Sequence, residues 1–155
     1  MIENNVLVGE EGYLYLYAGG QKQFDYLLGK VIVENKSVNN FHRNIESRVD
    51  FCDKNEIVYR HIVFPSKPLV KFDFLPLGFS NVKSVFDEYY NNNTPVLNKY
   101  CIYPLDKLIF SDKLCSVFQK LDTHNSDFGS LEIAKAIFQD LSLNINFDDY
   151  IDCLE

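Results

Sequence analysis

The fold is decided by the stretch SVNNFHRNIESRVDFCDKNEIVYRHIVFP, residues Ser37–Pro65, because it joins a helical pattern directly to a strand pattern. Its first part repeats apolar residues at steps of three and four, the spacing of one buried helix face, at Val38, Phe41, Ile45, Val49 and Cys52. Its second part, Ile57–Pro65, is rich in β-branched and aromatic residues and ends at a proline, which favours a strand. A helix followed at once by a strand indicates an α/β architecture.

The segments on either side predict further elements. Upstream, VLVGEEGYLYLY (Val6–Tyr17) has two apolar runs around two glycines, which predicts a β-hairpin. Downstream, prolines interrupt PSKPLVKFDFLPLGF, so an irregular connection rather than a regular helix is expected there. The remaining expected elements are a helix begun by Ser80 and ended by NNNTP, a second strand over Val96–Tyr103, a short helical turn in PLDKLIF, and a final helix over Asp127–Leu141.

Composition and charge restrict the class of protein. The 155 residues fit one domain, residues 1–155, and 46% hydrophobic residues allow a proper core. The net charge of −7 includes 14 basic and 14 acidic side chains before residue 121, but one basic and eight acidic after it. This distribution of charge lacks the cluster of basic side chains that is typical of a protein that binds nucleic acid. Because two or three strands are few for an open sheet, we expect an unpaired edge and self-association into a homo-oligomer through it.

Cysteine spacing argues against a metal site, and hydropathy argues against a membrane span. The four cysteines form no C-x-x-C pair and lack a histidine at ligand spacing, so free, mostly buried thiols are expected rather than a metal site; they are Cys52, Cys101, Cys115 and Cys153. No cofactor is expected. No stretch approaches the ~20 apolar residues of a membrane span, and the start MIENNVLVGEEG lacks the order of a signal peptide.

A candidate catalytic pair stands in LDTHNSDFG, directly before the final helix. Asp122 and His124 are two residues apart, and Ser126 is a good helix cap. At this spacing the carboxylate can accept the Nδ1 proton, which leaves Nε2 free as a base. The same pattern also suits a carboxylate-paired surface histidine with no catalytic role.

Other polar residues are weaker candidates. His61 lies inside the expected strand and is predicted to be a satisfied sheet histidine, whereas His42 is predicted to be solvated on the polar side of its helix. Ser66, in FPSKP, is the one serine of ten in a strand-end turn. The sharp strand-to-helix elbow of a nucleophilic serine is not indicated around it.

Four elements of the chain, in order, resemble the amino-terminal part of a known domain. They are GEEGYLYLY, IESRVDFCDKNEIVYRHIVFPSK, FPSKPLVKFDFLP, and Asp122-Thr123-His124 followed by Gly129. The domain is the SGNH-hydrolase-like domain of bacterial polysaccharide O-acetylation proteins of the alginate type, and the resemblance covers about residues 5–142. One departure is Asn125, which stands where the family has tryptophan.

This resemblance implies a partial three-layer, flavodoxin-like SGNH sheet flanked by helices. It implies that Asp122 orients and His124 acts as general base in a Ser-His-Asp triad of an O-acetyltransferase or acetylesterase. The substrate would be a cell-surface polysaccharide such as alginate or capsule, the partner that polysaccharide or an acyl-donor protein, and the location extracytoplasmic. The family's serine lies downstream in a Gly-Asp-Ser turn, so the chain alone is expected to be inactive. The alternative is a non-catalytic interaction module that uses an open sheet edge.

Overall fold

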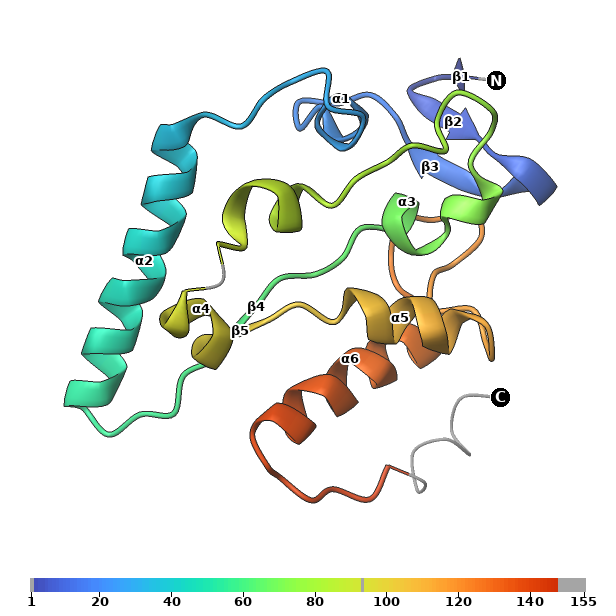
Figure 1. Ribbon diagram of the computed structural model, residues 1–155. Helices are drawn as coiled ribbons and strands as arrows, with labels where there is room; N and C mark the ends of the chain where they lie inside the picture. The colour runs from blue at the N-terminus through green and yellow to red at the C-terminus, as the bar shows by residue number, and fades with distance from the viewer. Residues whose placement is uncertain (1, 93, 148–155) are drawn as a thin grey trace.

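An antiparallel sheet forms the N-terminal end of the computed structural model, which describes residues 2–92 and 94–147 (Figure 1). Its strands are β1 (Ile2–Glu3), β2 (Val6–Val8) and β3 (Leu14–Leu16), in the order β1-β2-β3. The hairpin predicted over Val6–Tyr17 is confirmed, since Leu7 pairs with Tyr15 and both are buried. A short 3-10 turn, η1 (Glu10–Gly12), joins β2 to β3.

The two glycines of this hairpin serve different purposes. Gly12 has a φ of +80°, a left-handed conformation that glycine adopts without a steric cost. Gly9 has an extended backbone instead. A Cβ at Gly9 would overlap the carbonyl oxygen of Phe74 and lie 2.7 Å from the Tyr15 ring. Gly9 is therefore needed for close packing, and Gly12 for the turn.

The long helix predicted from the sequence is confirmed as α2 (Asn35–Lys54), which follows the short α1 (Gln23–Leu27). Its apolar stripe faces the protein, where Ile45 and Val49 are buried against Leu97 and Tyr100. Figure 1 shows α2 standing along one side of the molecule, opposite the antiparallel sheet. The helical period of the sequence thus placed one face of α2 correctly.

A second, parallel sheet consists of β4 (His61–Ile62) and β5 (Cys101–Ile102), with His61 opposite Cys101. The strand predicted over Ile57–Pro65 is confirmed only for these two residues of β4. The strand predicted over Val96–Tyr103 is wrong for its first five residues, because α4 (Pro95–Tyr100) occupies them. The described residues therefore form a mixed α/β fold with two small sheets.

The helix α4 forms because Thr94 and Pro95, at the end of NNNTP, are residues that favour a helix start. Thr94 caps this helix, since its side chain accepts a hydrogen bond from the backbone N–H of Leu97 at 3.4 Å. Pro95 occupies the first helical position, where its missing N–H costs nothing. NNNTP therefore begins the next helix as well as closing the segment before it.

The segment between β4 and β5 also differs from what the sequence predicts. Within the proline-rich stretch, α3 (Lys67–Val70) forms one helical turn with Pro68 in the tolerated first turn, and η2 (Phe72–Phe74) follows. The helix predicted from Ser80 is wrong in its start. The helical geometry is a single π-turn, η3 (Phe86–Tyr90), and the backbone N–H of Asp87 donates to the Ser84 hydroxyl at 3.1 Å.

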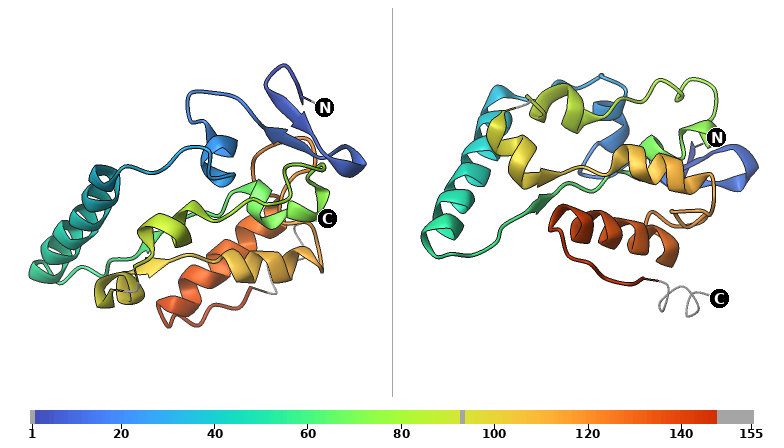
Figure 2. Two further views of the ribbon diagram at one scale, coloured as in Figure 1. Left: turned by 45° about the horizontal axis from the view of Figure 1, so that its top comes forward. Right: turned by 60° about the horizontal axis from the view of Figure 1, so that its bottom comes forward.

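Two helices complete the structure and are both confirmed. They are α5 (Leu105–Asp112) and α6 (Asp127–Asp140), which lie side by side in both views of Figure 2. Their inner faces share a core with α3 and the loop after α5; its buried members are Val70, Leu108, Val117, Phe118 and Ile133. This core supports the loop that carries Asp122 and His124.

Three of the four cysteines lie within the described residues. Cys52 and Cys101 are partly buried free thiols, but Cys115 is exposed, contrary to the expectation of mostly buried thiols. Cys153 lies outside the described residues. Among residues 2–92 and 94–147, no helix combines the length and the apolar character needed to cross a membrane.

Candidate active site

The loop that carries Asp122 and His124 is closed at its base by antiparallel pairing. Phe118 and Asn125 form an isolated bridge, and the backbone N–H of Ser126 donates to the Val117 carbonyl at 3.0 Å. Directly below, the Ser126 hydroxyl caps α6 by accepting from the Gly129 N–H at 3.0 Å. A local turn and a helix cap together therefore position the loop.

The predicted hydrogen bond between Asp122 and His124 is confirmed. Nδ1 of His124 lies 2.8 Å from Oδ1 of Asp122, and the same oxygen accepts the backbone N–H of His124 at 3.2 Å. A carboxylate can only accept, so this contact places the proton on Nδ1 and leaves Nε2 as an acceptor. The imidazole is 82% exposed and the carboxylate 49% exposed, so Nε2 is open to an incoming hydroxyl.

Hydrogen bonding also keeps the Asp122 carboxylate charged. The contact from the His124 side chain, followed by the backbone N–H groups of His124 and Thr123, lowers the pKa of Asp122 below its ordinary value. Asp122 is therefore ionised at neutral pH and can stabilise an imidazolium. Because its pKa is lowered in the folded chain, its contribution to stability is present above the ordinary aspartate pKa. That contribution is lost as the pH falls through the folded pKa.

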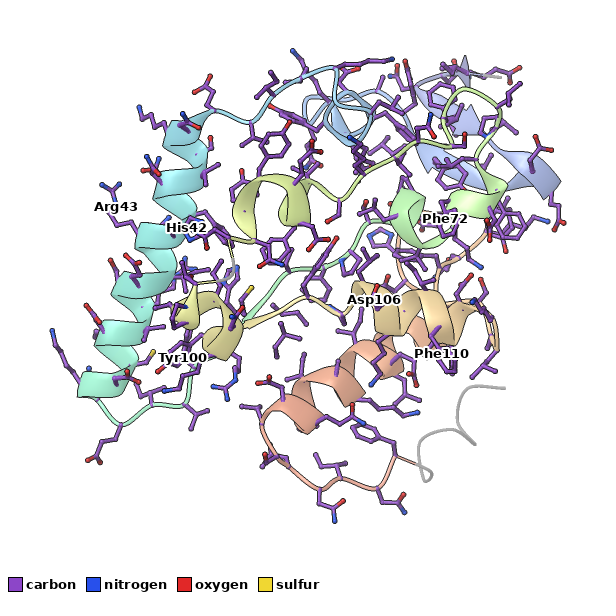
Figure 3. All side chains as sticks on the ribbon, viewed as in Figure 1. His42, Arg43, Phe72, Tyr100, Asp106 and Phe110 are labelled. Carbon is purple, nitrogen blue, oxygen red and sulfur yellow. The ribbon has the colours of Figure 1, made fainter. Side chains whose placement is uncertain are left out.

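Replacing His124 with alanine is expected to raise the pKa of Asp122, because the imidazole supplies the largest cause of the lowering. Titration of the Asp122 carboxyl carbon by NMR measures this shift. His42→Ala is the control, since His42 lies on α2 (Figure 3) and makes no contact with the loop. An unchanged Asp122 titration in His124→Ala would show that the ring contact has no electrostatic effect.

A buried lysine that was not predicted from the sequence donates hydrogen bonds to the backbone of this loop. Lys67, at the start of α3, is 3% exposed, and its ammonium donates to the carbonyl oxygens of Gln119, Lys120 and Asp122 at 2.6 to 2.9 Å. Burial, followed by the nearby charge of Lys71, lowers the pKa of Lys67 to about 8, so the ammonium form predominates at pH 7. No pattern in the sequence marks Lys67, because its partners are backbone carbonyls far away along the chain.

A cleft of about 310 Å³ lies beside the pair. The loop residues Thr123, His124 and Asn125 form one wall, and the segment from Phe64 to Pro68 forms part of the other. A larger cavity of about 930 Å³, toward α2, shares Gln23, Phe64 and Ser66 with this cleft. A small ligand in the cleft would lie next to the imidazole.

The other residues considered from the sequence lie apart from this pair. Ser66 borders the cleft, but its Oγ is buried and has no protein partner among the described residues, so it is not presented as a nucleophile. His61 is a satisfied sheet histidine as predicted, with Nδ1 3.3 Å from the Tyr59 hydroxyl. Burial and then Arg48 lower the pKa of His61, which keeps it neutral at pH 7.

The solvation predicted for His42 is wrong. Its ring lies edge-on to Phe41 at 5.6 Å, and its Nε2 is buried without a partner among the described residues. The helix period placed His42 on the polar side of the helix, but tertiary packing covers its Nε2.

Over the described part of the chain, no group of three or more His, Cys, Asp or Glu side chains is placed to hold a metal ion. Comparisons with protein-family models, with curated proteins and with solved structures found no match.

Proposed function

We propose that this chain supplies the Asp-His part of a Ser-His-Asp acyl-transfer site. The reaction would be that of an O-acetyltransferase or acetylesterase acting on cell-surface polysaccharide. The observation that carries the proposal is the 2.8 Å contact between Asp122 and His124 Nδ1, which leaves an exposed Nε2 beside a cleft. The order of the four sequence elements supports the same family, and with it a partial three-layer SGNH sheet in this chain.

The chemistry follows from the orientation of the imidazole. Nε2 of His124 removes the proton of a serine hydroxyl, whose oxygen attacks the carbonyl carbon of the acetyl donor. His124 then returns the proton to the leaving group, and an acetyl-serine forms. In the second half, Nε2 deprotonates a sugar hydroxyl or water, which takes the acetyl group and restores the serine. Asp122 remains ionised and stabilises the imidazolium in both halves.

The serine required by this scheme is not placed by the described residues. None of the ten serines stands in a Gly-Asp-Ser sequence, and the Ser66 hydroxyl is buried. The decisive measurement therefore compares the 155-residue chain with a version extended through a downstream Gly-Asp-Ser turn, using an activated acetyl ester and an acetylated polysaccharide as substrates.

We expect no appreciable turnover by the 155-residue chain and no effect of His124→Ala in it. In the version extended through a Gly-Asp-Ser turn, His124→Ala should lower kcat by roughly 10⁴-fold or more, the scale of losing a triad member. His42→Ala is the matched control and should leave turnover unchanged. Turnover that is independent of His124, or its absence despite a Gly-Asp-Ser turn, would contradict the proposal.

One observation favours the alternative of an interaction module. The residues beside β4 expose large apolar side chains, since Ile57 is 50%, Val58 75% and Phe64 59% exposed. A surface of this kind can pair with another chain. Light scattering distinguishes the two candidates. A mass that doubles with concentration and returns to that of a monomer in Val58→Lys, without turnover in the extended version, would favour the module.

A further inference from the structure

We propose that Lys67 is the positioning residue of the Asp122–His124 pair. This inference rests on the proposed function for its catalytic meaning. The buried Lys67 ammonium fixes the backbone position of the loop that carries the pair. In that position the Asp122 carboxylate contacts Nδ1 of His124.

The contacts of Lys67 are concentrated on this loop. Its ammonium lies 2.6 Å from the carbonyl oxygen of Gln119 and 2.9 Å from those of Lys120 and Asp122. A fourth carbonyl, from Leu14 in β3, lies at 2.7 Å. Three N–H groups thus serve four converging oxygens, and three of these oxygens belong to the loop. A compact ammonium suits such a point of convergence better than a planar group does.

The surroundings keep this interaction strong. The ring centroids of Tyr13 and Tyr15 lie 5.4 and 5.2 Å from the Lys67 ammonium, and the lysine is almost inaccessible to solvent. Aromatic faces attract a cation, and exclusion of water strengthens its hydrogen bonds to carbonyl groups. The carbonyl oxygens of Gln119, Lys120 and Asp122 are therefore held by an ammonium that is shielded from solvent.

The link from this anchor to the imidazole is one residue long. Asp122 is bound through its own carbonyl oxygen to Lys67, and through its side chain to His124. Oδ1 of Asp122 also accepts the backbone N–H groups of Thr123 and His124, so the carboxylate is held within its own turn, and Lys67 fixes where the backbone of that turn lies. Lys67 touches neither ring nitrogen of His124, and it acts on the imidazole through Asp122.

The test measures the proton position on His124 in the 155-residue chain, by nitrogen NMR of histidine side chains at a pH where the imidazole is neutral. In the wild type we expect the Nδ1–H form that the Asp122 contact requires. Lys67→Gln should lose this signature while the helical signal of the chain persists. Sucrose in the buffer favours the folded state and keeps the variants comparable.

Lys71→Gln is the matched control. Lys71 is an equally buried lysine four residues further along, but its ammonium pairs with Asp112 at 2.8 Å and not with the loop. It should keep the Nδ1–H signature. If Lys67→Gln does not fold, Lys67→Arg takes its place, because a planar guanidinium cannot meet four converging carbonyls and should lose the signature too.

Two results would overturn the inference. The first is a folded Lys67 variant in which His124 keeps the wild-type signature, and the second is an equal loss in a Lys71→Gln variant that is itself folded. Neither readout depends on turnover. Failure of this inference is therefore distinguishable from failure of the proposed enzyme activity.

Discussion

Gly129→Ala is expected to lower the free energy of unfolding by about 3 kcal/mol, the upper part of the range for an overpacked core. Gly129 lies in the first turn of α6, where the helix approaches the backbone of Val117. A Cβ there would overlap the Val117 carbonyl oxygen and lie 2.8 Å from its carbonyl carbon. Backbone atoms cannot move away by changing rotamer, so α6 itself would have to shift from the core.

Urea unfolding of Gly129→Ala measures this loss, and Gly20→Ala is its control. An added Cβ at Gly20 meets nothing within 4 Å, and its φ lies outside the left-handed region. The control should therefore be neutral or more stable by up to about 1 kcal/mol, since alanine restricts the unfolded chain. Equal unfolding midpoints for the two variants would mean that the contact between α6 and Val117 is not close.

Lys71→Met is expected to lower the free energy of unfolding by about 3–5 kcal/mol, as when one partner of a buried ion pair is removed. The Lys71 ammonium lies 2.8 Å from Asp112, and the two side chains are 3% and 13% exposed. Methionine keeps most of the apolar stem, so the loss reports the charge and its hydrogen bond. Asp112 would keep the backbone N–H of Val117, at 3.0 Å, as a partial partner.

A double-mutant cycle with Asp112→Asn separates the pair from its surroundings. If the ion pair carries the effect, the double variant should be more stable than the sum of the two single losses predicts. Lys113→Met is the control, because Lys113 is exposed and should change stability by less than about 0.5 kcal/mol. Strict additivity of Lys71→Met and Asp112→Asn would argue against the ion pair.

The elements predicted well from the sequence are those specified by nearby residues. The helix α2 follows from a repeated apolar spacing, and α6 follows from the Ser126 cap and a similar stripe. The Asp122 to His124 contact was predictable for the same reason, because two residues in one turn leave few arrangements. In each case the residues that make the interaction also make the pattern.

The errors arise where the deciding contact is distant or ambiguous. Val96–Tyr100 has a strand-like composition, but the cap from Thr94 and the proline at position 95 favour a helix. Lys67 reads in sequence as an ordinary solvated lysine. Its partners are backbone carbonyls more than fifty positions away, and carbonyl groups leave no trace in the side-chain pattern.

The contact between β3 and the loop of His124 has a consequence for the order in which the chain acquires its structure. Leu14 donates its N–H to the Lys120 carbonyl at 3.0 Å, and its own carbonyl accepts from Lys67. These bonds close a very long segment of chain. The loss of chain entropy on closure opposes their formation. The loop that carries Asp122 and His124 therefore takes its place beside β3 only after distant parts of the chain have met.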